Sequence, residues 1–204
     1  MIDSIFDFLN PEFILLHGGV TLLFIVVFME AGIFFGFFLP GDSLLFITGL
    51  LCDSHALNWT PYSLIAGLTA MVVLGTMVGY ATGRWAEHWL RDRPDSFFYK
   101  KNYMDMTLAF YEKRGMMTFI IGRFLPVVRT FIPILAGIAR IDFVKFMIYN
   151  FLGAFIWITT MVMSGYLLGN RFPLLNEHVE LIVIGMVLVT SVPLLISFFR
   201  KRKQ

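Results

Sequence analysis

Charge and cysteine are both scarce in this chain. Only 15% of its 204 residues are charged, whereas a soluble globular domain carries about 25%, and the composition is too apolar for a disordered chain. The single cysteine, Cys52, excludes an intramolecular disulfide, and no cysteine and histidine residues have the spacing of a zinc site. The first lysine or arginine is Arg84, so we expect no cleaved signal peptide. A net charge of +2 gives no reason to expect nucleic acid as a partner.

Apolar residues make up 58% of the sequence, and they lie in long blocks. A helix needs roughly 20 apolar residues to cross a bilayer. The blocks near or above this length are residues 13–51, 63–83, 116–139, 143–169 and 181–199. We therefore predict an all-α polytopic membrane protein with about four full transmembrane helices, folded as a single membrane domain over residues 1–204.

The basic residues predict which loops face the cytoplasm. Residues 84–114 hold seven basic residues, and residues 200–203 are all basic, so we expect both segments on the cytoplasmic face. The helix at residues 181–199 would then end in the cytoplasm. Because residues 181–199 end in the cytoplasm, residues 143–169 must run outward from it. Both ends of residues 116–139 then lie on the cytoplasmic side, so this segment must enter and leave by that face. By the same count, residues 31–51 enter and leave by the outer face. We predict two re-entrant helical hairpins that enter from opposite faces.

Each predicted hairpin contains residues that break helices. Pro40 and Gly41 lie in the first hairpin, and Pro126 and Pro133 lie in the second. Broken backbone survives at membrane depth only where protein or a water-filled cavity satisfies its polar groups, so these turns predict a cavity. A tight helical hairpin or a proline-kinked helix is the alternative for each segment, and hydropathy does not separate them.

Two five-residue segments recur at the same distance of 86 residues. The matches are residues 36–40 with 122–126, and residues 79–83 with 165–169. We interpret them as a duplication, with repeat one at about residues 13–86 and repeat two at about residues 116–169. Because the two hairpins enter from opposite faces, this is the inverted-repeat plan of secondary transporters. Between the repeats, residues 84–114 are predicted to form an amphipathic cytoplasmic loop, and residues 181–199 a C-terminal helix.

Four ionisable residues interrupt the apolar segments. Glu30 and Asp42 flank the first turn, and Arg123 and Arg129 lie in the second. Each costs on the order of 2.5–3.5 kcal/mol at the centre of a membrane helix, and such residues usually mark transport pathways. The acidic pair is our candidate for proton coupling, because partial burial favours the protonated form of a carboxyl group and a nearby arginine favours the charged form, so such a group can bind and release protons. The alternative is that the opposite charges form purely structural ion pairs.

The two arginines predict a phosphate clamp. They lie six residues apart with Pro126 between them, so they can converge on one anion, and a guanidinium group suits phosphate oxygens. Thr130 adds a hydroxyl group beside Arg129. Asn150, alone in an apolar helix, either lines a cavity or bonds to another helix.

Glycine recurs every four residues at Gly75, Gly79 and Gly83. This spacing puts the three glycines on one face of a helix. The pattern is typical of two helices that pack closely, which we favour over contact with a ligand.

Together these motifs resemble the DedA, or VTT-domain, family of bacterial inner-membrane proteins. The residues that carry the resemblance are Glu30, the turn at residues 38–42, the run at residues 122–137, Asn150 and Trp157. The resemblance implies two opposed re-entrant hairpins, a location in the inner membrane and a role in moving lipids between leaflets. It also implies undecaprenyl phosphate or phospholipids as substrates, dependence on the proton motive force, and essential roles for Glu30, Asp42, Arg123 and Arg129.

We therefore expect a proton-motive-force-dependent flippase for a phosphate-bearing lipid, with the C-terminus in the cytoplasm. Its expected partners are membrane lipids and protons, and we expect no enzyme activity, cofactor or metal. One alternative is a membrane-integrity factor that transports nothing and uses its charges as structural ion pairs. A less favoured alternative is a lipid phosphatase, because residues 116–139 contain no histidine to assist a nucleophile.

Overall fold

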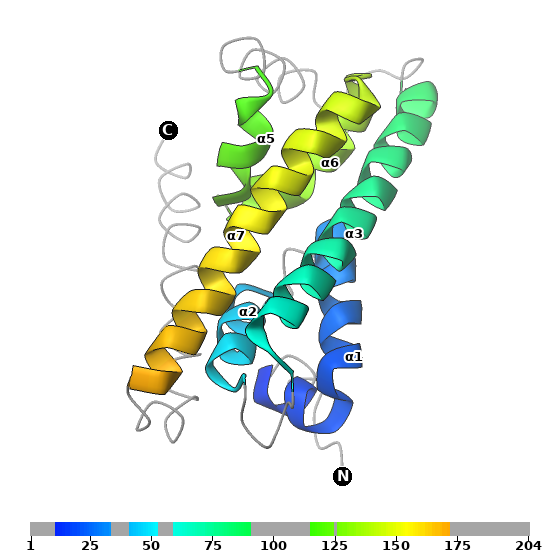
Figure 1. Cartoon of the computed structure of the whole chain (residues 1–204). Coiled ribbons are helices and arrows are strands. Elements are labelled where there is room, and N and C mark those ends of the chain that lie inside the picture. The colour runs from blue at the N-terminus through cyan, green and yellow to red at the C-terminus, as the bar shows by residue number, and fades with distance from the viewer. Residues whose placement is uncertain (1–10, 34–40, 53–58, 91–114, 125, 172–204) are drawn as a thin grey trace, which may run out of the picture. The chain divides into compact units, whose positions relative to one another are not determined.

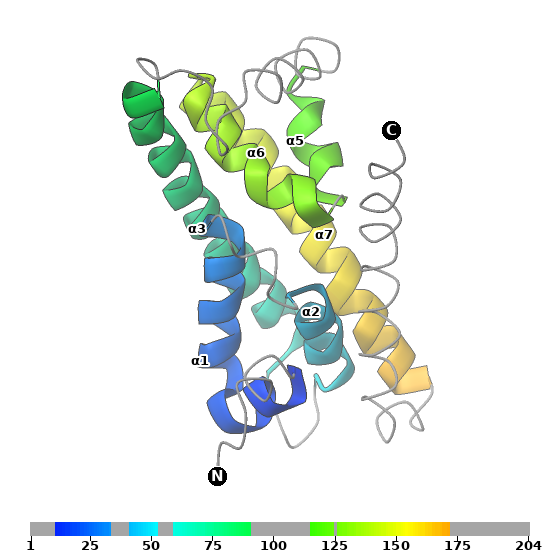
Figure 2. The ribbon, with the colours of Figure 1, turned by 180° about the vertical axis from the view of Figure 1, so that it is seen from behind.

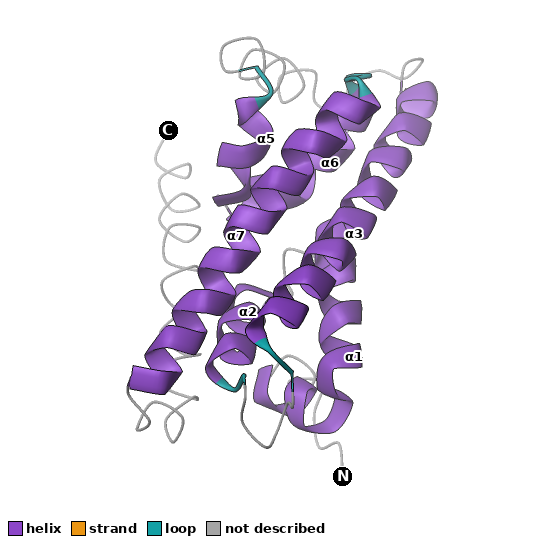
Figure 3. Ribbon diagram, in the orientation of Figure 1, coloured by secondary structure: helices purple, strands orange, loops and turns teal. Residues whose placement is uncertain are grey.

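In the computed structural model, every regular element of the described residues is a helix (Figure 3). The description covers residues 11–33, 41–52, 59–90, 115–124 and 126–171. The elements are α1 (Pro11–Gly32), α2 (Gly41–Leu50), α3 (Pro61–Leu90), α5 (Met117–Ile121), the 3-10 helix η3 (Gly122–Phe124), α6 (Pro126–Ile138) and α7 (Phe143–Arg171) (Figure 1). The prediction of an all-α chain is confirmed for this part of the sequence.

Helices α3 and α7 are long and apolar enough to cross a membrane, over Pro61–Ala86 and Phe143–Arg171. Helix α3 continues to Leu90, so the first residues of the predicted loop at 84–114 are helical. The rest of that loop and the predicted helix at residues 181–199 lie outside the described residues. The exposed side of α7 is itself apolar, as expected of a helix that faces lipid. Its exposed residues include Val144, Ile148, Phe151, Phe155 and Ile156.

Helix α1 bends at Gly19, which has φ 55° and ψ −155°. This conformation suits glycine because glycine has no Cβ atom to clash with the backbone. The bend leaves a shorter apolar helix, Gly19–Gly32, in place of one uninterrupted crossing.

The described residues fall into two compact units, which we treat separately. One unit contains residues 11–23, 41–52, 59–64 and 160–171, and the other contains residues 24–33, 65–90, 115–124 and 126–159. In the first unit α2 packs closely against the end of α7. A Cβ atom on Gly49 would collide with the backbone of Val162, and one on Gly165 would collide with the backbone of Phe46.

In the second unit α5, η3 and α6 form a helix, a tight turn and a second helix. Figure 2 shows η3 joining α5 to α6, whose far ends both point to the top of the view. Helix α6 begins at Pro126, a position that suits proline because the first N–H of a helix lacks an intrahelical partner. This is the path expected of a hairpin over residues 116–139, and its insertion into a membrane stays a prediction.

The structure corrects the prediction for Pro133, which lies inside α6 and not in a turn. Proline is tolerated inside a helix where neighbouring elements satisfy the backbone polar groups that it leaves without a partner. Here Gly79 of α3 leaves room for Pro133, since a Cβ atom on Gly79 would lie 3.2 Å from the Cβ atom of Pro133. The first predicted hairpin is described only in part, because Pro40 lies outside the described residues and Gly41 begins α2.

Close packing through glycine is confirmed for α3. A Cβ atom on Gly75 would lie 2.5 Å from the carbonyl oxygen of Phe28 in α1, and one on Gly83 would collide with the backbone of Ile134 in α6. Gly83 of α3 and Gly169 of α7 are 86 residues apart, and both pack on a short helix, α6 and α2 respectively. The two glycines make similar contacts in their separate units, and the duplication itself stays a prediction.

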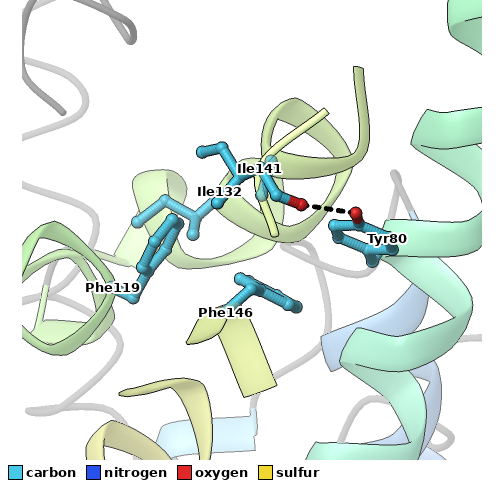
Figure 4. Packing of buried hydrophobic residues seen from close by; sticks show 6 residues of the cluster. Tyr80, Phe119, Ile132, Ile141 and Phe146 are labelled. Atoms are coloured by element: carbon cyan, nitrogen blue, oxygen red, sulfur yellow. Dashed lines mark hydrogen bonds between the residues drawn. The ribbon is translucent and has the colours of Figure 1, made fainter. Parts of the chain in front are cut away.

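An aromatic cluster fixes α3, α5, α6 and α7 of the second unit together (Figure 4). The Phe146 ring stacks on Tyr80 with 5.2 Å between centroids, and meets Phe119 edge-on at 5.1 Å. The Tyr80 hydroxyl donates to the carbonyl oxygen of Ile141 at 2.6 Å. Because Phe119 precedes η3 and Phe146 lies one turn before Asn150, this cluster sets the positions of Arg123 and Asn150.

Candidate functional site

Glu30 lies on the buried side of α1. It falls three and four residues after Val27 and Val26, which are also buried, and this spacing puts all three on one helix face. Ile25 and Met29, one turn apart on another side of α1, are exposed. A carboxylate is therefore placed where the helix pattern calls for an apolar side chain, and such a group needs a charged or hydrogen-bonding partner.

Arg129 of α6 is that partner. Its Nη2 atom donates to Glu30 Oε1, and the two side chains are 11% and 7% exposed. The guanidinium carbon of Arg129 also lies 4.6 Å from the centre of the Trp157 ring, a distance at which a cation is attracted to the face of an indole. Arg129 is thus held between a carboxylate of α1 and an aromatic ring of α7.

Arg123 has a different environment. It lies in η3 with 7% of its surface exposed, and its Nη2 atom donates to the side-chain oxygen of Asn150 in α7. Asn150 in turn donates from Nδ2 to the hydroxyl oxygen of Thr76 in α3 at 2.7 Å. Of the two readings of Asn150, the structure shows the hydrogen bond between helices.

The Nε atom of Arg123 is buried and has no hydrogen-bond partner among the described residues. Glu30 and Arg129 form an ion pair, whereas Arg123 bonds to a neutral amide. A buried guanidinium group that keeps a positive charge and an unused N–H donor is suited to bind an anion.

Gly153 makes room for Arg123 on α7. A Cβ atom at this position would lie 3.0 Å from Arg123 Cδ and 3.1 Å from the Cα atom of Ile120. A larger residue would push η3 and the arginine stem away from α7. Gly153 and Asn150 are one turn apart, so the same face of α7 receives both the stem and the head of Arg123.

The other predicted site residues are placed as follows. Thr130 follows Arg129 in α6 and is buried at 3% exposure. Asp42 is half-buried in the first turn of α2, where the positive end of the helix dipole favours a carboxylate. Asp42 belongs to the first compact unit and the four residues Glu30, Arg123, Arg129 and Asn150 to the second.

Two residues of the site have roles that the sequence pattern did not reveal. Thr76 accepts the bond from Asn150, although nothing in the glycine-rich sequence around it marks this hydroxyl group as part of a site. Trp157, noted only for a family resemblance, covers Arg129. Its position seven residues after Asn150, about two helical turns, is the signal that places both on one face of α7.

Comparison with known proteins gives a consistent result. Residues 20–167 match the VTT domain. The chain is 33% identical to Protein DedA of Escherichia coli over 183 residues, which is 90% of this chain and 83% of that protein. It is 36% identical to an uncharacterized membrane protein of Mycobacterium tuberculosis over 95% of this chain and 87% of that protein. It is 30% identical to the inner membrane protein YqjA of Escherichia coli over 82% of this chain and 75% of that protein. No solved structure matches the chain significantly.

Proposed function

The chain belongs to the VTT-domain family of membrane proteins that includes DedA, and from this membership and its buried arginines we propose that it moves a phosphate-bearing lipid between the leaflets of a membrane. The proposed ligand is undecaprenyl phosphate or a phospholipid, whose shared feature is a phosphate group on an apolar tail. The chain offers buried cations for the phosphate and apolar exposed helix faces for the tail.

The state of Arg123 is the observation that carries this proposal. Removing a cation from water is costly unless a negative charge or several hydrogen bonds replace the water. Among the described residues Arg123 has a neutral amide as its partner and an unused Nε–H donor. A phosphate oxygen supplies both the missing charge and the missing acceptor.

Glu30 links this site to protons in the proposed mechanism. Its carboxylate holds Arg129, so a phosphate group that approaches Arg129 must compete with Glu30. Protonation removes the negative charge of Glu30 and releases the guanidinium group, which then joins Arg123 in a clamp on the phosphate. Loss of that proton restores the ion pair and expels the phosphate. Asp42 is proposed as the second proton-binding group.

Reconstituted vesicles test the proposal directly. The full chain is incorporated into vesicles that contain a fluorescent phospholipid in both leaflets, and a membrane-impermeant reductant is added outside. Lipid movement exposes the inner-leaflet dye, so we expect quenching beyond the outer-leaflet share. Arg123→Lys keeps the charge but loses the planar fork, so most of the movement should be lost. Arg171→Lys, at the exposed end of α7, is the matched control and should behave as the unsubstituted protein.

Two other outcomes of this assay assign different functions. Vesicles that show no movement while phosphate is released would indicate a lipid phosphatase. Vesicles that show neither would favour a membrane-integrity factor. The Glu30–Arg129 pair supports this second candidate, because a buried ion pair between α1 and α6 also holds two helices together.

We also propose that the chain lies in a bacterial inner membrane with its C-terminus in the cytoplasm. The basic segment at residues 200–203 supports this orientation. In a Cys52-free background, single cysteines at Asn58 and Asn176 should react with an impermeant reagent from outside. Cysteines at Lys100 and Gln204 should not react, and labelling of Lys100→Cys from outside would invert the proposed topology.

A further inference from the structure

Three polar side chains from three helices are bonded in series beside the proposed phosphate site. They are Thr76 of α3, Asn150 of α7 and Arg123 of η3, with 1%, 2% and 7% of their surfaces exposed. We infer that Thr76 and Asn150 are positioning residues, which hold Arg123 so that its Nε–H side receives a phosphate oxygen. Arg123 is then the arginine that always contacts the anion. The inference rests on the proposed function and goes beyond it. It assigns different roles to the two arginines and adds two residues to the site.

The direction of each hydrogen bond follows from the atoms involved. The Thr76 hydroxyl has one hydrogen, which it donates to the backbone carbonyl of Val72 at 3.0 Å or of Val73 at 2.9 Å. Its oxygen therefore accepts from the amide nitrogen of Asn150 at 2.7 Å. The amide oxygen of Asn150 is then turned toward Arg123, where it accepts from Nη2. If the Asn150 amide were flipped, its NH2 group would face the Arg123 guanidinium, which is also a donor. Thr76 therefore fixes the orientation in which Asn150 can accept from Arg123.

Asparagine at position 150 leaves the charge of Arg123 available. A carboxylate there would form an ion pair, as Glu30 does with Arg129. The neutral amide occupies one N–H of Nη2 and leaves the positive charge and the buried Nε–H to be satisfied. Arg129 differs because its charge is already balanced. The arrangement thus favours binding of a phosphate at Arg123 before Arg129 takes part.

Exchanging the Asn150 amide for a carboxylate tests the inference, because the two side chains differ in only one heavy atom. Asn150→Asp places a negative charge beside Arg123, so the folded protein should keep or gain stability while it loses phosphate binding. A residue that only supports the fold would not produce these opposite changes. The thermal midpoint of the full chain in detergent gives the stability, and its rise with added phosphatidylglycerol gives the affinity. We expect the apparent affinity of Asn150→Asp to fall by about tenfold or more, which corresponds to about 1.4 kcal/mol.

Thr76 provides a second, milder test. Thr76→Val keeps the shape but removes the acceptor that orients Asn150, so the affinity for phosphatidylglycerol should fall in the same direction. Thr76→Ser keeps the hydroxyl group and should restore the affinity of the unsubstituted protein. If Asn150→Asp fails to fold, this pair decides the matter alone. A Thr76→Val protein that is less stable but binds with unchanged affinity would overturn the positioning role.

Two controls separate this inference from the proposed function. Diacylglycerol with the same acyl chains lacks the phosphate and should give no shift, and inorganic phosphate reports the anion without the lipid. Normal phosphatidylglycerol binding by Asn150→Asp would overturn the inference and leave the flippase proposal standing. A shift with inorganic phosphate but not with phosphatidylglycerol, lost in Asn150→Asp, would support the Arg123 site and overturn the lipid substrate. No shift with any phosphate compound in the unsubstituted protein would overturn both.

Discussion

The Glu30–Arg129 ion pair makes a quantitative prediction about stability. Exposed salt bridges contribute about 0–1 kcal/mol, but these side chains are 7% and 11% exposed, which places the pair among buried ones. Removing one partner of a buried pair costs about 3–5 kcal/mol, because the other charge stays buried without compensation. We therefore expect Glu30→Gln and Arg129→Met each to lower the free energy of unfolding by about that amount.

The double variant distinguishes an ion pair from two independent contacts. It leaves no uncompensated charge, so its loss of stability should fall short of the sum of the single losses by about 3 kcal/mol or more. The assay is reversible unfolding of the purified protein by SDS in mixed micelles, followed by far-ultraviolet circular dichroism. Single losses that add to within about 0.5 kcal/mol of the double loss would refute the pairing.

Two further predictions concern the helices that hold the site. Gly83→Ala should lower the free energy of unfolding by about 1–3 kcal/mol, because the new Cβ atom meets the rigid backbone of Ile134. Gly67→Ala, in the same helix, is the control. Its Cβ atom meets the movable ring tip of Phe24, so this variant should be neutral or stabilising in the same SDS assay. Asp142→Ala should cost about 1 kcal/mol, because the Asp142 carboxylate caps α7 by accepting the Lys145 amide at 2.9 Å. Asp142→Asn keeps an acceptor and should retain most of this stability, and an equal loss in both variants would argue against the cap.

Some parts of the site follow from the sequence because the cost of burying charge is a local property. Glu30, Arg123 and Arg129 stand out in apolar segments whatever the fold, and pairing of opposite charges was one of the two readings. The choice of partner required the structure. Glu30 and Arg129 are 99 residues apart, and nothing in the periodicity of either helix states which arginine faces the acid.

Other parts depend on contacts between helices that no single helix encodes. Thr76 and Asn150 are 74 residues apart, so their hydrogen bond becomes apparent only once α3 and α7 pack. Pro133 misled the prediction because proline usually ends a helix, whereas the space beside Gly79 allows α6 to continue. The glycine spacing of α3 was more informative, since a face without side chains predicts close packing before the partner helix is known.

Lipid selectivity in reconstituted vesicles tests the central claim most directly. The measurement is the rate at which dye-labelled phosphatidylglycerol and dye-labelled diacylglycerol with the same chains cross the membrane, for the unsubstituted chain and for Arg123→Lys. We predict faster crossing of the phosphate-bearing lipid than in protein-free vesicles, most of which is lost in Arg123→Lys. Diacylglycerol should cross at the protein-free rate in both cases. Equal acceleration of both lipids, or full phosphatidylglycerol movement by Arg123→Lys, would contradict phosphate recognition at the buried arginine.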